Sequence, residues 1–177
     1  MTKRENHYEA AFETYLRTHQ IPYVAVDETR RTLRDGESLK SLDFLISRPQ
    51  SPGWLIDIKG RRFPTGRRKQ YWKNWSTTDE LRSLAHWETL FGPGFLGLLV
   101  FAYWLADDQS PVPVEEIFPF RGRLYAFVGI RLDHYAGWVK PLSPKWNTVT
   151  VSVPRFRELA RPLGSFLHPA VRPNVAV

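Results

Sequence analysis

The eleven residues 95–105, FLGLLVFAYWL, constrain the fold more than any other segment because none of them is charged. A strand that is apolar on both alternating faces is stable only in a sheet whose two faces are both covered. Loop-forming sequences bound the run, with GPG before it and DDQSPVP after it. The run therefore predicts a central, buried strand of an α/β fold.

A second apolar segment, GWLIDIKGRR at residues 53–62, contains an aspartate and a lysine two positions apart. In a strand, alternate residues point to the same side, so Asp57 and Lys59 would share one face. Burying unpaired charge is costly, so other groups must compensate this pair. Either an Asp–Lys salt bridge or a metal ion with a phosphate could do so.

The surrounding patterns predict a core in the order helix, strand, strand, strand, helix, strand. Tyr8, Phe12 and Leu16 have helical spacing, and the pattern stops before Pro22. Candidate N-caps, first-turn acids and a closing Gly-Pro-Gly indicate the second helix. A polar segment with a central Asp-Gly reads as a loop or hairpin between the first two strands. The elements are expected, in order, at residues 4–21, 22–26, 42–47, 54–60, 76–94 and 95–105.

Beyond residue 105, alternating apolar residues predict additional strands at residues 123–132 and 147–153, and a short helix follows within 154–163. The tail from His168 shows no periodic pattern, so we expect it to be loosely held. No linker or internal repeat divides the chain. We therefore interpret all 177 residues as one domain, with a core at about 5–105 and an extension at about 106–167.

The composition favours a soluble, cytoplasmic protein that binds a polyanion. Cysteine is absent, which excludes a disulfide scaffold and a thiolate metal site. The sequence shows no apolar leader and no run of about 18 apolar residues, so no membrane association is expected. The formal charge of +7 favours a nucleic-acid partner.

Much of the positive charge lies in residues 59–73, KGRRFPTGRRKQYWK, which hold seven Lys or Arg and no acid. Cations neutralise phosphates, and the aromatic residues among them can stack on bases. A solvated basic loop is the alternative interpretation. The cations expected to contact nucleic acid are Arg61, Arg62, Arg67, Arg68, Lys69 and Lys73.

Acids lie at three points of the predicted core, which suggests phosphodiester chemistry. A hairpin would bring Asp43 beside Asp57, and a helical acid, Glu9 or Glu13, precedes both. Mg²⁺, or Mn²⁺ in its place, takes such oxygen ligands together with phosphate oxygens. The Ile58 carbonyl is the expected third ligand. Lys59 can then position the nucleophile and offset charge in the transition state.

The strings LDFLIS and WLIDIKG, with HYEAAFE upstream, resemble the PD-(D/E)XK nuclease superfamily, especially its archaeal Holliday-junction-resolvase-type branch. The resemblance covers about residues 5–105 and implies a restriction-endonuclease-like mixed sheet flanked by helices. It places the metal-binding aspartate at Asp43, the second acid at Asp57, the catalytic lysine at Lys59 and the helical glutamate at Glu9. Leu42 replaces the proline of the family motif. HYEAAFE also matches the signature of the HYExAFE family of bacterial proteins.

Two glutamates compete for the helical position. Glu9 lies at the edge of the apolar stripe, three and seven residues before Phe12 and Leu16, and would face the sheet. Glu13 has Arg17 four residues later, which favours a surface ion pair. We therefore assign the second ion, or a water of the first, to Glu9.

Three functions remain open from the sequence. The first is a divalent-metal-dependent nuclease acting on DNA, with RNA as an alternative substrate. The second is a nucleic-acid-binding module on the same fold that does not cleave. The third is an interaction protein whose Asp57–Lys59 pair is purely structural. Cutting both strands of a duplex usually needs two active sites, so a homodimer is a further expectation.

Overall fold

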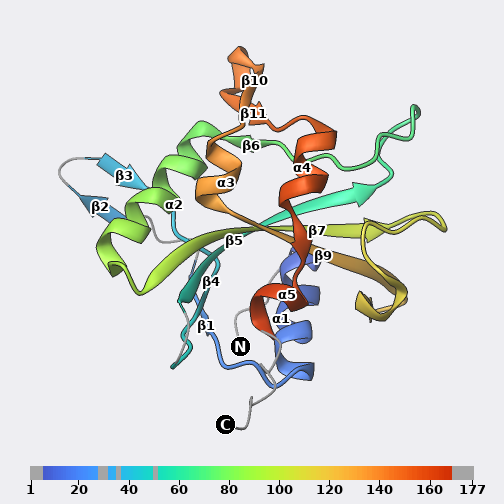
Figure 1. The fold of residues 1–177 in the computed structure, drawn as a ribbon, viewed down its shortest axis with the longest axis horizontal. Helices are drawn as coiled ribbons and strands as arrows, with labels where there is room; N and C mark the ends of the chain where they lie inside the picture. Colours follow the sequence, from blue (N-terminus) through green and yellow to red (C-terminus); the bar gives the residue numbers. More distant parts are fainter. Residues whose placement is uncertain (1–5, 28–31, 35–36, 50–51, 169–177) are drawn as a thin grey trace, which may run out of the picture.

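The computed structural model describes residues 6–27, 32–34, 37–49 and 52–168 of the chain. A mixed sheet forms its centre, in the order β1-β4-β5-β7-β9-β12, with β8 paired to β9 (Figure 1). Strands β5 and β7 are parallel, whereas β4 and β9 run antiparallel to them. The strands are β1 (Val24–Ala25), β4 (Phe44–Ile46), β5 (Gly53–Phe63), β7 (Phe95–Leu105), β8 (Ile117–Phe120), β9 (Arg123–Arg131) and β12 (Arg161–Pro162).

Helices cover both faces of this sheet, as the apolar run of β7 requires. On one face lie α1 and α5, and on the other lie α2, α3 and α4, which Figure 1 shows below and above the sheet. Residues Leu98–Tyr103 of β7 are completely buried between the two layers. The predicted central strand is therefore confirmed. The helices are α1 (His7–Thr18), α2 (Thr78–Phe91), α3 (Leu132–Ala136), α4 (Val153–Leu159) and α5 (Gly164–Leu167).

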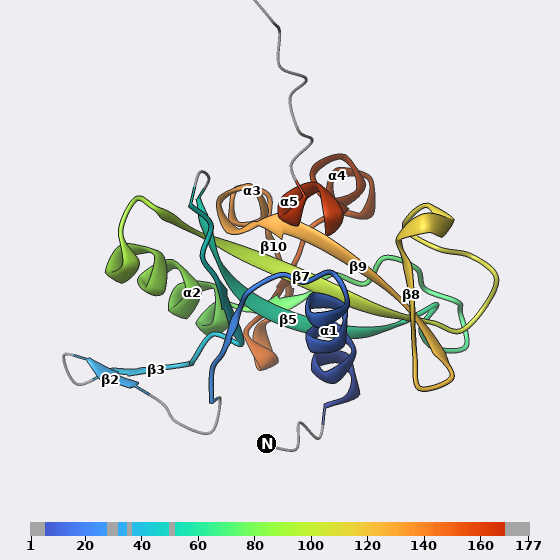
Figure 2. The same ribbon diagram turned by 90° about the horizontal axis from the view of Figure 1, so that it is seen from below.

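Helix α1 forms where the sequence predicts it. The Asn6 side chain caps it by accepting a hydrogen bond from the Tyr8 backbone at 3.0 Å. Its apolar stripe meets the sheet through Phe12, whose ring makes edge contacts with Phe44 and Phe127 at 5.0 and 5.5 Å between centroids. This packing fixes α1 relative to β4 and β9, and α1 also contacts β5 (Figure 2).

Strand β5 alternates as expected. Ile56 and Ile58 face α1, whereas Leu55 belongs to the core beneath α2. Asp57 and Lys59 therefore lie on the α2 face of the sheet. The strand is longer than predicted, because its pairing with β7 continues to Phe63 opposite Leu105. The first residues of the basic segment are consequently strand and not loop.

Smaller elements lie around the sheet, and several of them were not predicted. Strand β2 pairs antiparallel with β3 in the segment where the sequence predicts a loop or hairpin. Strands β10, β11 and β6 form a separate small sheet. Strands β6, β8, β10 and β12 are too short to give a clear periodic signal. Of the predicted loose tail, only His168 lies within the described residues. The bounds are β2 (Thr32–Arg34), β3 (Glu37–Leu39), β6 (Ser76–Thr77), β10 (Lys140–Ser143), β11 (Thr148–Thr150), and 3-10 turns at Val114–Glu116 and Pro144–Trp146.

No helix within the described ranges is long and apolar enough to cross a membrane.

Gly60 is needed where α1 approaches β5. A Cβ atom at this position would lie 2.2 Å from Cδ2 and 2.5 Å from Cγ of the Tyr8 ring. We expect Gly60→Ala to lower the free energy of unfolding by about 1–3 kcal/mol, because Tyr8 and the start of α1 must move. Urea unfolding measures this. The control Gly94→Ala has open space around the new methyl group, and equal stability of the two variants would contradict the proposed contact.

Candidate active site

An open cavity of about 350 Å³ lies at the edge of the sheet beside the N-terminal end of β4. The residues predicted for catalysis, Glu9, Asp43, Asp57 and Lys59, all line it, as does Ile58. They come from the first turn of α1, from the residue before β4 and from the middle of β5. Residues far apart in the sequence therefore meet at one opening.

The two aspartates lie opposite each other across the β4–β5 ladder. Phe44 pairs with Ile56, so the next position places Asp43 opposite Asp57. The Ile56 carbonyl accepts a hydrogen bond from the Asp43 backbone at 2.9 Å, and the Ile58 N–H donates to Asp43 Oδ2 at 2.5 Å. Backbone groups of alternate residues point to the same edge, so the Ile58 carbonyl also points to the side where β4 ends.

Lys59 is held between two carboxylates. Its ammonium lies 2.6 Å from Asp57 Oδ2 and 2.9 Å from Glu80 Oε2, and only 5% of its side chain is exposed. The Asp–Lys contact therefore exists, but along one strand and with a second acid from α2. A buried ammonium with two carboxylate partners has little freedom to move.

Glu80 is the residue that sequence reasoning missed. It stands in the first turn of α2, where it forms a capping box with Thr77, and its second oxygen lies 2.7 Å from Lys40 Nζ. Burial by itself would raise its pKa, but Lys59 and Lys40 outweigh burial and hold the pKa of Glu80 well below its ordinary value. The Thr-x-x-Glu spacing signals the cap in the sequence. Nothing in that spacing indicates a contact with β5.

Asp57 has the opposite electrostatic environment. Burial raises the pKa of its carboxyl above the ordinary value, although Lys59 opposes the shift. Its Oδ2 atom is buried and, in the part of the chain that is described, accepts no hydrogen bond of standard geometry. The carboxylate thus contacts an ammonium but lacks the hydrogen bonds that a buried acceptor usually has.

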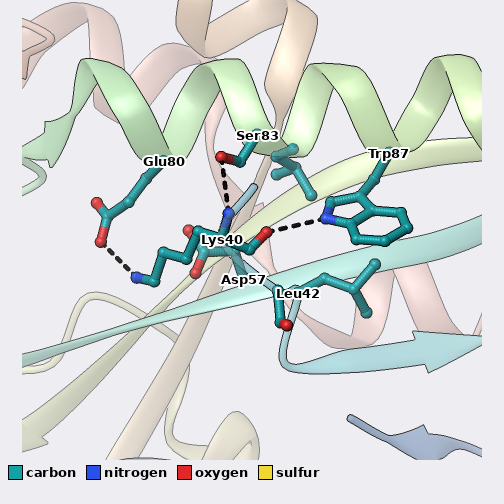
Figure 3. A pocket seen from close by; sticks show the side chains of 8 residues that line it. Lys40, Leu42, Asp57, Glu80, Ser83 and Trp87 are labelled. Carbon is teal, nitrogen blue, oxygen red and sulfur yellow. Dashed lines mark hydrogen bonds and ion pairs between the residues drawn. The ribbon is translucent and has the colours of Figure 1, made fainter. Parts of the chain in front are cut away.

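Lys40 closes the side of the site towards α2. Its N–H donates to Ser83 Oγ at 3.2 Å, and its carbonyl accepts a hydrogen bond from Trp87 Nε1 at 2.9 Å (Figure 3). A second, small cavity of about 10 Å³ lies here beside Asp57. Trp87 therefore has a packing role between α2 and the Lys40 main chain.

The helical acids separate as the sequence analysis predicted. Glu9 is 7% exposed, lines the cavity, and accepts a hydrogen bond from the Asn6 side chain at 2.6 Å. Glu13 instead binds Arg17 at 3.0 Å and accepts a hydrogen bond from the Tyr23 hydroxyl at 2.8 Å. The predicted surface pair of Glu13 is confirmed, and the catalytic role of Glu9 stays a prediction.

The predicted nucleic-acid contacts divide into two groups. Arg61 is half-buried: its guanidinium donates to the carbonyls of Gly60 and Trp75 and stacks 3.9 Å from the centre of the Trp75 ring. Arg61 therefore belongs to the wall of the cavity. Its predicted contact with nucleic acid stays a prediction. Lys73 is also half-buried. Exposed side chains of this set are Arg62, Arg67, Arg68 and Lys69.

The donor atoms at this opening suit a hard divalent cation. Two facing carboxylates and a backbone carbonyl are typical oxygen ligands for Mg²⁺. The buried Asp57 oxygen without a regular hydrogen bond fits a metal ligand. Within the described ranges, however, no group of three or more His, Cys, Asp or Glu is arranged to hold a metal ion. Any such site would therefore have to use Asp43, Asp57 and main-chain oxygen in place of a cluster of acids.

Comparison with known proteins supports the fold. The structure is similar to that of Hjc, a Holliday junction resolvase from the archaeal hyperthermophile Archaeoglobus fulgidus, with a TM-score of 0.55 and 9% sequence identity. The match covers 91% of this chain and 98% of the resolvase chain. The predicted mixed α/β fold of resolvase type is therefore confirmed. No family model and no curated protein matches the chain, so membership of the HYExAFE family stays a prediction.

The contact between Glu80 and the two lysines should stabilise the fold. We expect Glu80→Gln to lower the free energy of unfolding by about 2–3 kcal/mol, because glutamine can still cap α2 but cannot neutralise buried Lys59. Asp79→Asn is the matched control, since Asp79 pairs with exposed Arg82 at 2.9 Å and should cost less than about 1 kcal/mol. Equal losses in urea unfolding would show that Glu80 acts only as a cap.

Proposed function

We propose that the chain is a divalent-metal-dependent nuclease that hydrolyses DNA phosphodiester bonds at this cavity. The observation that carries the proposal is the meeting of Glu9, Asp43, Asp57 and Lys59 at one opening. Those positions match the PD-(D/E)XK pattern one by one, in a chain with the fold of a Holliday junction resolvase. The fold by itself would support nucleic-acid binding as well as cleavage.

The charges of the cavity support a role for a cation. Its lining contains four carboxylates, Glu9, Asp43, Asp57 and Glu80, against the three cations Lys40, Lys59 and Arg61. A phosphate that enters is repelled by so many carboxylates unless another positive charge is present. Mg²⁺ or Mn²⁺ bound by Asp43, Asp57 and the Ile58 carbonyl would supply that charge and act as a Lewis acid on the phosphate.

The side chains of the protein would orient the reacting groups. Lys59 can donate hydrogen bonds to a phosphate oxygen or to the attacking water, because an ammonium has three donors. Glu80 gives Lys59 a second partner, so the ammonium would stay in place if Asp57 bound a metal ion. Glu9 faces the opening from α1, where it can hold a water or a second ion. The exposed cations Arg62, Arg67, Arg68 and Lys69 are suited to the nucleic-acid backbone.

One observation favours the structural alternative. Lys59 is almost fully buried and fully paired, as expected for a salt bridge that only supports the fold. This alternative predicts that Lys59→Ala strongly lowers the melting temperature while the native protein has no cleavage activity to lose. The nuclease proposal predicts that Lys59→Ala still binds Mn²⁺ in calorimetry but no longer cleaves DNA.

Cleavage should depend on a divalent ion and on Asp57. We expect the native protein to cut at least one member of a panel of labelled single-stranded, duplex and branched DNA in the presence of Mg²⁺ or Mn²⁺. EDTA should abolish the cleavage. Asp57→Asn should lower the rate at least about 100-fold, because the metal loses a carboxylate ligand.

The control Asp133→Asn removes the same charge from an exposed acid that pairs with Arg131 at 2.5 Å, and it should keep full activity. Undiminished cleavage in EDTA, or by the Asp57→Asn protein, would refute the metal-dependent mechanism.

The helical acid can be identified by a paired comparison. Glu9→Gln should lower the cleavage rate by at least about 10-fold, because the cavity loses one of its carboxylates. Glu13→Gln removes the same charge one helical turn away, where it changes the contacts with Arg17 and the Tyr23 hydroxyl and leaves the lining of the cavity intact. Both variants are assayed under single-turnover conditions. The reverse ranking would place the catalytic acid at Glu13.

A further inference from the structure

A tryptophan stands exposed at the tip of the hairpin that joins β10 to β11. Trp146 is 69% exposed, at the end of the 3-10 turn Pro144–Trp146. Figure 1 shows this hairpin projecting beyond the helices α2, α3 and α4. An indole ring in water forgoes the burial that usually stabilises it.

The tip is anchored to the rest of the molecule. Asn147, in the left-handed conformation, donates from its N–H to the Pro144 carbonyl at 3.2 Å, which closes the turn. Its carbonyl accepts a hydrogen bond from the Thr78 N–H at 2.9 Å. Next to it, Thr148 pairs with Thr77 of β6. These contacts hold the backbone beside Trp146, so its exposure does not result from a loose segment.

The same contacts place the hairpin tip beside the start of α2. Thr77 and Thr78 begin α2, and the Thr77 cap binds Glu80, which lines the cavity. Trp75, directly before β6, lines it too. The tip therefore lies next to the first turn of α2, which contributes Glu80 to the cavity.

The charge around the tip fits a polyanion. Residues 138–157 contain four Lys or Arg and no acid. The Lys145 ammonium lies 5.3 Å from the centre of the Trp146 ring, and Lys140 is exposed at the start of β10. An aromatic ring beside cations is typical of surfaces that bind single-stranded nucleic acid.

We propose that Trp146 stacks on an unpaired base of the nucleic acid whose backbone enters the cavity. The inference rests on the proposed function and narrows its substrate to molecules with a single-stranded stretch beside the cleaved bond. A base offers its face to a protein ring only where it is not stacked inside a duplex. The ring, the nearby cations and the opening thus form a base-stacking site and a phosphate site side by side.

Binding in the absence of metal tests this proposal separately from cleavage. Fluorescence anisotropy in EDTA would compare a labelled single-stranded oligonucleotide with a duplex of the same sequence. We expect Trp146→Ala to weaken binding to the single strand by about 5-fold or more and binding to the duplex by less than about 2-fold. Trp146→Phe keeps an aromatic face and should recover most of the loss.

Trp138→Ala is the matched control, because Trp138 is a 49% exposed tryptophan before β10, at the opposite end of the hairpin from the tip. It should bind both probes nearly as the native protein does. Stacking would also quench the tryptophan fluorescence of the native protein more than that of Trp146→Ala when the single strand is added.

Several outcomes would overturn the proposal. These are equal losses on single strand and duplex, equal effects of Trp138→Ala and Trp146→Ala, unchanged affinity of Trp146→Ala, and no binding of single strands at all. Loss of self-association in Trp146→Ala, without a change in DNA affinity, would assign the ring to a second copy of the chain. Stacking without any cleavage by the native protein would refute only the nuclease proposal. Cleavage by the native protein together with unchanged affinity of Trp146→Ala would refute only the stacking proposal.

Discussion

Strand β5 pairs with β7 along all of its length but with β4 along only its first half, and the cavity depends on that difference. Pairing with β7 holds the second half of β5 rigid, while its other edge is open beyond the N-terminal end of β4. Asp43 stands at that end and accepts a hydrogen bond from the Ile58 N–H, which would otherwise lack its ladder partner. The carboxylate thus both completes the sheet and faces the opening.

The same half of β5 holds charges that an apolar sheet does not normally tolerate. Asp57 and Lys59 are each about 5% exposed, and Glu80 from α2, itself paired with Lys40, is a second carboxylate partner of Lys59. Apolar residues of similar size often give comparable or greater stability than a buried ion pair. The proposed chemistry would give a reason for this arrangement, because an ammonium held in place can stabilise charge that develops on a phosphate.

Elements after the core of residues 5–105 complete the surroundings of the site. Strand β9 covers the far edge of β7, and β11 pairs with β6 so that the tip of the hairpin touches the start of α2. Helix α2 therefore has two roles. Glu80 of its capping box holds the Lys59 ammonium inside the cavity. The Thr78 backbone N–H binds the hairpin that carries Trp146.

The sequence by itself determined the features that depend on local periodicity. Alternation placed Asp57 and Lys59 on one face, an uninterrupted apolar run identified β7 as central, and spacing along α1 separated Glu9 from the surface pair of Glu13 with Arg17. Contacts between distant segments were decided only by the tertiary structure. The capping-box pattern that contains Glu80 looks the same in the sequence whether or not the glutamate also contacts a buried lysine. The contact of Glu80 with Lys59 was therefore missed. Arg61 looked like an exposed cation because nothing local shows that the Trp75 ring and carbonyl enclose its guanidinium. Both depend on how helix α2 and the segment before it pack against the open half of β5, and that packing is set by many weak contacts with no pattern of their own in the chain.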